Sequence, residues 1–280
     1  MTDAIIAVLE WINDMVLGMA SDQGKLTGTF RAFMPSLYDY SDTIMRSVIQ
    51  PVAYTVLALF LLLEIHKIVV KTDSMTGNAT NFGSEIVFKV LFKATICKIV
   101  VDNIPLLLNG IYSFTTSLTV MISSIGGTNT LSGGIDVLAI ETSIDNLNFW
   151  SGLIYLILAF LVFLISFIAV ILANVMICAR FIELFLYFSV APIPIATLPS
   201  EEMSQIGKNF IKNFTAVCLQ GTLIFIVLTF FPYLFNSRIF TYTSTFDIFA
   251  ELMGILGYSV VLLIAIFATG KWAKAICNAI

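Results

Sequence analysis

Few residues of this chain have the types and spacing that catalysis needs. The single histidine, His66, lies between Glu64 and Lys67 near the end of an apolar run, where an interfacial residue is more common than a ligand or a general base. The sequence has no Ser/His/Asp set, HExxH motif, P-loop or GxGxxG motif, which carry nucleophilic, zinc and nucleotide chemistry. We therefore expect no enzymatic activity and no cofactor.

Two groups of charged residues are better candidates for a function. Arg180 and Glu183 are three residues apart where the longest apolar run ends, which permits an ion pair on one helix face; two interfacial residues that merely end the run are an equal alternative. Lys89, Lys93 and Lys98 form a basic series. We interpret it either as a pore mouth that screens the phosphates of a nucleic-acid strand, or as lysines that reach anionic lipid headgroups, which is the more common use.

The elements that must position these groups follow from the composition. Apolar residues make up 59% of the 280 positions and charged residues 11%, where soluble domains average about 25% charged. So little charge cannot cover the surface of a soluble globule, and a net charge of −4 argues against a broad basic surface for nucleic acid. The four cysteines lie far apart in apolar stretches, and we predict neither a disulfide nor a metal site from them. They are Cys97, Cys178, Cys218 and Cys277.

Long apolar stretches predict an all-α polytopic membrane protein. A span needs roughly 20 mostly apolar residues, and five stretches meet that length within a transmembrane helical domain at 47–280. The predicted spans are about 47–70, 104–123, 149–179, 214–235 and 252–270. The stretch 86–101 carries the three lysines and is predicted to be a basic amphipathic helix at the membrane interface.

Residues 1–46 are predicted to be an external N-terminal amphipathic region. Apolar residues recur there at helical spacing, with acidic residues at the margin of the apolar stripe. The stripe consists of Ile5, Val8, Leu9, Ile12, Met15, Val16 and Met19. Its acidic polar face disfavours anionic lipid, so packing against a partner or against another part of the chain is favoured over packing on the outer leaflet.

The segment 184–199 is apolar but contains Pro192, Pro194 and Pro199. Each proline removes a backbone donor and resists helix continuation, so a regular crossing helix is not expected. Irregular backbone at membrane depth must be covered by protein or water, which favours a re-entrant or protein-covered turn. A surface loop that follows the end of the preceding helix is an equal alternative.

The distribution of lysine and arginine orients the chain. With the N-terminus outside, the C-terminus cytoplasmic and the segment 180–213 cytoplasmic, ten of the 14 basic residues lie on the cytoplasmic side. These are Lys67, Lys71, Lys89, Lys93, Lys98, Arg180, Lys208, Lys212, Lys271 and Lys274. The loop 124–148 has no lysine or arginine and is predicted to be external.

Polar and small residues inside the spans indicate contacts between helices. The polar residues that are placed to hydrogen-bond across helices are Asn109, Asn174 and Gln220. The small pairs that permit close packing are Ala169 with Ala173 and Gly254 with Gly257.

One series of motifs is specific in its order. The pair Arg180 and Glu183 is followed by an Ala-Pro-x-Pro turn at 191–194 and a short acidic stretch at 201–202, and then come the runs GKNF at 207–210 and CLQG at 218–221. In this order of motifs, the stretch 178–221 resembles the TrbL-like family, the polytopic inner-membrane subunit of type IV secretion systems, in the form found in conjugative elements of Gram-positive bacteria. Large members of that family carry an external central domain, which is reduced here to the loop 124–148.

The resemblance implies a function and partners. The chain is expected to be a non-enzymatic channel or scaffold component of a conjugative DNA-transfer machine in the bacterial inner membrane, where it helps to form the translocation path for DNA or protein. The implied partners are the ATPase and bitopic membrane subunits of the machine, further copies of the chain, the lipid bilayer and, transiently, the transferred single-stranded DNA. The alternative is a stand-alone transporter or channel for a small solute.

The proline turn is interpreted as a fixed break that positions a cytoplasmic platform, 201–212, for an ATPase or another subunit of the machine. The residues that we expect to act in structure or assembly are Arg180, Glu183, Pro192, Pro194, Lys208 and Lys212.

Overall fold

The chain is an all-α polytopic membrane protein, as its composition predicts. The computed structural model describes residues 6–8, 10–11, 24–73, 80–126, 149–236 and 248–279, and every regular element in those ranges is helical. Five helical runs among them are long and apolar enough to cross a membrane. These runs are Pro35–Val70, Ile104–Ile125, Gly152–Val190, Ser204–Phe230 and Leu252–Ile276.

The chain divides into two compact units, which are described separately. Unit 1 comprises Met1–Gly28, Thr116–Arg180 and Gln220–Trp272, and unit 2 comprises Thr29–Thr115, Phe181–Leu219 and Ala273–Ile280. Four long helices contribute residues to both units. They are α7 (Ile104–Gly126), α9 (Phe149–Val190), α11 (Ser204–Asn236) and α12 (Ile248–Ile276).

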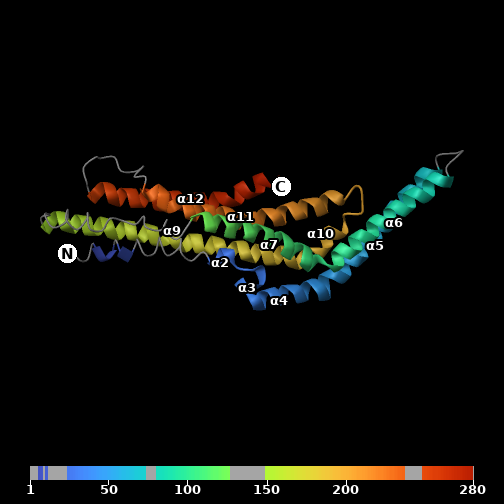
Figure 1. The fold of residues 1–280 in the computed structure, drawn as a ribbon, viewed down its shortest axis with the longest axis horizontal. Coiled ribbons are helices and arrows are strands. Elements are labelled where there is room, and N and C mark those ends of the chain that lie inside the picture. The colour runs from blue at the N-terminus through green and yellow to red at the C-terminus, as the bar shows by residue number, and fades with distance from the viewer. Residues whose placement is uncertain are drawn as a thin grey trace. The chain divides into compact units, whose positions relative to one another are not determined.

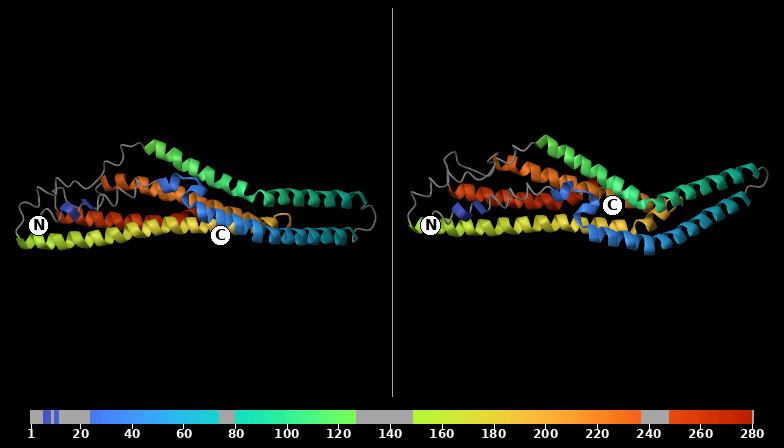
Figure 2. Two further views of the ribbon diagram at one scale, coloured as in Figure 1. Left: turned by 90° about the horizontal axis from the view of Figure 1, so that it is seen from below. Right: turned by 60° about the horizontal axis from the view of Figure 1, so that its bottom comes forward.

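Unit 1 is a bundle of apolar helices joined by small and hydroxyl side chains. In both Figure 1 and Figure 2, α9 and α12 lie side by side, and the hydroxyls of Ser166 and Ser259 hydrogen-bond between them at 2.9 Å. The buried side chains of Ala169 and Ala173 let a neighbouring helix approach α9 closely. The outward face of α9 is apolar, with Phe160 and Ile168 exposed. An exposed apolar face is expected for a helix that contacts lipid. The short helix α2 (Gly24–Thr27) also falls in this unit.

Unit 2 contains two antiparallel helical rods. The first comprises α4 (Pro35–Ile44), the π-helical stretch η1 (Met45–Ile49) and α5 (Gln50–Asp73), preceded by the short helix α3 (Phe30–Phe33). The second comprises α6 (Thr80–Asp102), a turn at Asn103 and the first part of α7. Figure 1 and Figure 2 show α5 and α6 side by side and antiparallel, and we call this pair the α5–α6 hairpin.

Both rods of unit 2 are interrupted at the same level. Gln50 directly follows η1, and Val101 lies one residue before Asp102, the last residue of α6. The Gln50 side-chain amide donates to the Val101 carbonyl at 3.4 Å. The Tyr54 hydroxyl donates to Asp102, so a second side-chain bond joins the rods at this level. Helix interruptions have identifiable causes such as π-turns and prolines, and here Pro51 and Pro105 lie just beyond η1 and Asn103.

The core of unit 2 is a cluster of aromatic rings around Phe30, which is fully buried. Its ring stacks on Phe185 of α9 at 4.7 Å between centroids and lies 5.1 Å from the ring of Tyr112 on α7. The ring of Phe33 stacks in parallel on Phe181. These contacts hold α3 against α7 and the last turns of α9 through large apolar rings.

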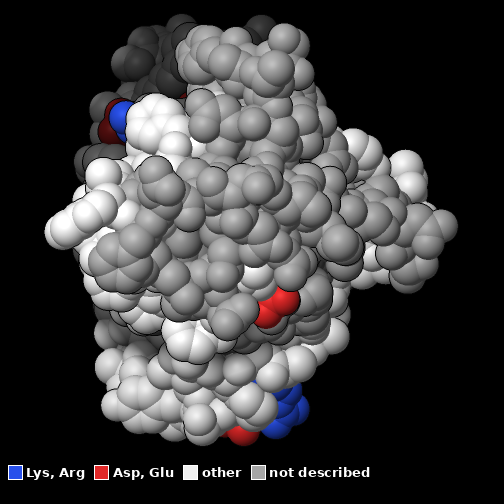
Figure 3. Space-filling model, turned by 90° about the vertical axis from the view of Figure 1, so that its left-hand side faces the viewer, with Lys and Arg blue, Asp and Glu red and all other residues white. Residues whose placement is uncertain are grey.

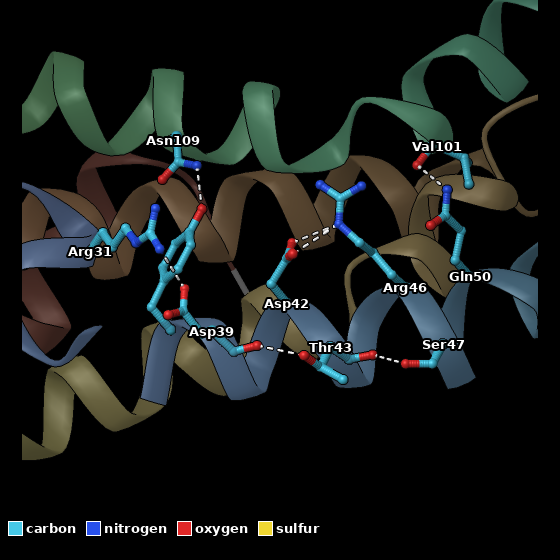
Figure 4. A network of polar contacts seen from close by, with 10 residues as sticks. Arg31, Asp39, Asp42, Thr43, Arg46, Ser47, Gln50, Val101 and Asn109 are labelled. Carbon is cyan, nitrogen blue, oxygen red and sulfur yellow. Dashed lines mark hydrogen bonds and ion pairs between the residues drawn. The ribbon is translucent and has the colours of Figure 1, made fainter. Parts of the chain in front are cut away.

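Polar side chains line one side of α4, and Figure 4 shows them between α4 and α7. Exposed ion pairs join Arg31 to Asp39 and Arg46 to Asp42, each at 2.9 Å. The amide of Asn109 on α7 donates to the Tyr38 hydroxyl at 2.9 Å, which confirms the predicted hydrogen bond of Asn109 between helices.

Several boundaries differ from the sequence prediction. Helix α9 continues past 179 to Val190. A helical run also begins at Pro35, before the predicted start at 47; Pro35 occupies a first-turn position, where its missing N–H needs no partner. The helix expected at 86–101 is longer and packs along α5. Most of the N-terminal stripe within 1–46, and residues 127–148 of the predicted external loop, lie outside the described residues.

Charge is sparse on the described surface that faces the viewer in Figure 3. Most described atoms there are uncharged, and the few charged side chains are scattered. That view agrees with the 11% charged residues of the composition.

Candidate functional site: the proline turn and its clamp

The proline segment forms a buried helical turn. Helix α9 ends at Val190, and α10 (Pro192–Ala196) begins after Ala191. Pro192 lies at the first position of α10, where a helix leaves its N–H groups without partners in any case. Pro192, Ile195, Ala196 and Ser200 are buried. Of the two predicted alternatives, the turn covered by protein is therefore the one observed.

The α5–α6 hairpin covers this turn. Helix α10 packs on both α5 and α6, and the Cys97 thiol of α6 donates to the Ile195 carbonyl at 3.1 Å. Burial raises the pKa of the Cys97 thiol to about 11. At neutral pH the thiol is therefore protonated and can donate to the carbonyl of the turn.

A buried carboxylate, Glu64 of α5, binds the segment between α10 and α11. The residue is only 6% exposed, and its Oε1 accepts from the Ser200 hydroxyl at 3.1 Å and from the Glu201 backbone N–H at 2.8 Å. Lys67 lies 3.9 Å from Glu64 and forms a closer pair with Glu202 at 2.7 Å. A buried carboxylate needs such partners, since an unpaired one is costly to bury. We call Glu64, Ser200 and Glu201 the Glu64 latch.

Gly207 of α11 allows α11 to pass close to the turn. A Cβ atom at this position would lie 2.7 Å from the Pro194 carbonyl oxygen and 2.7 Å from Cδ2 of Leu198. Real Cβ atoms do not come so near to backbone, so only glycine fits there without displacement. Beyond Gly207, Lys208 is exposed and Lys212 is half-buried.

The three lysines of the predicted basic series have different surroundings. Lys89 and Lys93 are exposed one turn apart on α6, whereas Lys98 donates to Asp102 at 3.0 Å. Hydrogen bonds from Tyr54 and Lys98 lower the pKa of the Asp102 carboxyl. Because the pKa is lowered, the stability that these two hydrogen bonds contribute is fully present above the ordinary pKa of aspartate. It is lost as the pH falls through the lowered pKa of Asp102. The structure thus separates Lys98 from the other two lysines.

Arg180 is buried in unit 1 against α11. Its side chain is 4% exposed, and a Cβ at Gly221 would lie 2.1 Å from Cζ of its guanidinium. Gly221 therefore provides the space that this buried cation occupies. Glu183 is half-buried, and its ion pair with Arg180 stays a prediction.

Two further polar residues of the spans have different outcomes. Asn174 is exposed and donates to the Val170 carbonyl of its own helix at 3.1 Å. The prediction of a bond between helices is wrong there, because the side chain can satisfy a carbonyl one turn back. Gln220 is buried, and its amide is the nearest group to a Cβ built at Gly270 of α12, at 3.4 Å.

Comparison with known proteins places this architecture in a family. A family model described as "TrbL/VirB6 plasmid conjugal transfer like protein" matches residues 12–192, which is more than half of the chain. The chain belongs to the TrbL/VirB6 family. It is therefore a multi-pass membrane component of a type IV secretion, or conjugation, system. No curated protein and no solved structure matches it.

The family match and the motif resemblance overlap only in part. The match ends at Pro192 and so includes α4 to α7 and α9. The motifs of 178–221 overlap it only up to that proline, and the acidic stretch, Gly207 and Gly221 lie beyond it.

Sequence reasoning missed the residues that hold the turn. The sequence shows Glu64 only as a charged residue near the end of a span, and Cys97 only as a cysteine in an apolar stretch. Their partners, Ser200 and Ile195, are more than 90 positions away along the chain, so no local spacing connects them. The one available signal was the pair of glycines in the motif series, because Gly207 and Gly221 both mark close approaches.

Proposed function

We propose that this chain is a non-enzymatic channel or scaffold subunit of a conjugation machine in the bacterial cytoplasmic membrane. Together with other subunits and further copies of itself, it forms the translocation path for DNA or protein. The observation that carries the proposal is the proline turn, which is buried under the α5–α6 hairpin and bound by the Glu64 latch. A turn held in this way gives the segment that follows it a defined position, which is what a scaffold requires.

The segment after the turn is a suitable docking surface for another subunit. Met203 is 41% and Ile206 is 49% exposed, and charged or polar residues surround them. Those neighbours are Glu201, Glu202, Gln205 and Lys208, all exposed. Apolar anchors within a polar rim are typical of protein interfaces. The proposed partner is the ATPase or another cytoplasmic subunit of the machine.

The proposed orientation has the N-terminus outside and the C-terminus in the cytoplasm. It rests on the distribution of lysine and arginine, which places the linker after α5 and the segment 191–203 on the same side. The docking surface is then cytoplasmic, where an ATPase can reach it.

Cysteine crosslinking in cells that carry the whole machine tests both the docking and the orientation. Met203→Cys and Ile206→Cys should each capture a cytoplasmic subunit, whereas Phe160→Cys, on an exposed face of α9, should not. If a membrane-impermeant thiol reagent added outside the cell labels position 203, both the proposed docking and the proposed orientation are contradicted. Solute flux through the purified protein alone in liposomes would favour the alternative, a stand-alone transporter or channel.

A further inference from the structure

The outer face of α6 is apolar and is flanked by lysines. Ala94, Cys97 and Val101 are buried on the face toward α5 and α10. At about 100° per residue, Phe88, Phe92 and Ile99 point the opposite way, and Phe88 is 70% and Phe92 59% exposed. Lys89 and Lys93 lie between the buried face and this apolar face, about 100° to 140° around the helix from Phe88.

We propose that the α5–α6 hairpin binds an anionic lipid surface. The outer apolar residues of α6 enter the acyl region, and the ammonium groups of Lys89 and Lys93 reach the phosphates of the headgroups. Helix α6 is then a membrane-associated helix, although it is not among the candidate spans found in the described residues.

The medium around α5 supports lipid as the occupant. Helix α5 belongs to the candidate span Pro35–Val70, and its outer face exposes Leu59, Leu62 and Leu63. Because α6 packs along α5, the outer faces of the two helices meet the same surroundings. An apolar face this extensive is not stable in water, and long lysine side chains allow an interfacial helix to keep its charges among headgroups.

The residues of this face argue against two other occupants, a second copy of the chain and single-stranded nucleic acid. In a symmetric contact with a second copy through this face, Lys89 and Lys93 would approach their own counterparts, and like charges repel. Single-stranded nucleic acid needs a basic groove with stacking aromatics, but Leu91, Ile96 and Ile99 make much of this exposed face aliphatic. Lys98 is already paired with Asp102.

A fluorescent bimane label at Phe92→Cys in the full-length protein tests this proposal. The four native cysteines are replaced, and the protein is placed in nanodiscs of phosphatidylcholine and phosphatidylglycerol, with bromine on the chains of one lipid or the other. We expect brominated phosphatidylglycerol to quench the label several-fold more than brominated phosphatidylcholine. The same label at Phe160→Cys, an exposed phenylalanine on the uncharged part of α9, should be quenched equally by both lipids.

Substitution of the lysines identifies the source of the preference. The double variant Lys89→Gln with Lys93→Gln should abolish the stronger quenching by brominated phosphatidylglycerol, and Lys89→Arg with Lys93→Arg should keep it. Both variants should elute from size-exclusion chromatography at the same volume as the parent protein. Quenching by aqueous iodide and by neither lipid, or equal quenching by both lipids in the parent, would overturn the proposal. Protection of the label from iodide by a single-stranded oligonucleotide would replace lipid with nucleic acid as the occupant.

Discussion

The two units bury polar groups of different kinds. Unit 1 pairs neutral hydroxyls, Thr119 with Thr222 at 3.0 Å and Ser166 with Ser259 at 2.9 Å, and its buried cation is Arg180. Unit 2 buries the carboxylate of Glu64 beside the proline turn. Hydroxyl pairs cost little to bury, whereas a buried carboxylate is tolerated only when its donors stay in place. The comparison indicates that the geometry of this chain is most constrained at the turn.

The largest expected effect is that of Gly207→Ala. The added methyl group would meet the Pro194 carbonyl, which is backbone and cannot turn aside, so we expect a loss of about 3 kcal/mol in the free energy of unfolding. Thermal unfolding in detergent measures it. Gly110→Ala is the matched control, because nothing lies within 4 Å of a Cβ there. Equal unfolding midpoints for the two variants would show that α11 does not pass the turn this closely.

Removal of the buried carboxylate should have the next largest effect. Glu64→Ala leaves the Ser200 hydroxyl and the Glu201 N–H without their acceptor, which should cost about 2 kcal/mol. Glu202→Ala removes only an exposed ion pair and should cost less than about 1 kcal/mol. The same unfolding measurement applies. If Glu202→Ala proves the more damaging variant, the turn is held by the surface pair and the contrast between the units disappears.

Gly221→Ala tests the buried cation of unit 1 and should cost about 1.5 kcal/mol. The effect is smaller than at Gly207 because the methyl group meets the end of a flexible side chain, Arg180, and not backbone. In an Arg180→Ala background the same substitution should cost almost nothing, and the difference measures their coupling. If Gly221→Ala costs as much in the Arg180→Ala background as in the parent, a contact other than Arg180 requires glycine at position 221.

The smallest effect should come from the hydroxyl pairs of unit 1. Thr119→Val removes one partner of a buried neutral pair and should cost about 0.6 kcal/mol, the typical value for such bonds between membrane helices. A double-mutant cycle with Thr222→Val isolates the pair. A coupling as large as the cost of Glu64→Ala would show that unit 1 depends on polar contacts as strongly as unit 2.

The helices and the membrane were predictable from the sequence, but the ends of the helices were less so. Composition and the length of apolar runs indicate spans, because lipid requires about 20 apolar residues per crossing. The predicted span ends at 179 because the uncharged run stops before Arg180, whereas α9 continues to Val190. The prolines act only from Pro192 onward, where they begin a new helix.

The amino-acid sequence by itself determined that lipid surrounds this protein, that it is all-α and that it has five apolar runs, since each depends on local composition. Only the tertiary structure decided that the proline turn is buried and that Glu64 and Cys97 hold it. Those outcomes depend on residues up to 137 positions apart. Contacts at such separations arise from the packing of helices, which periodicity within one helix does not specify.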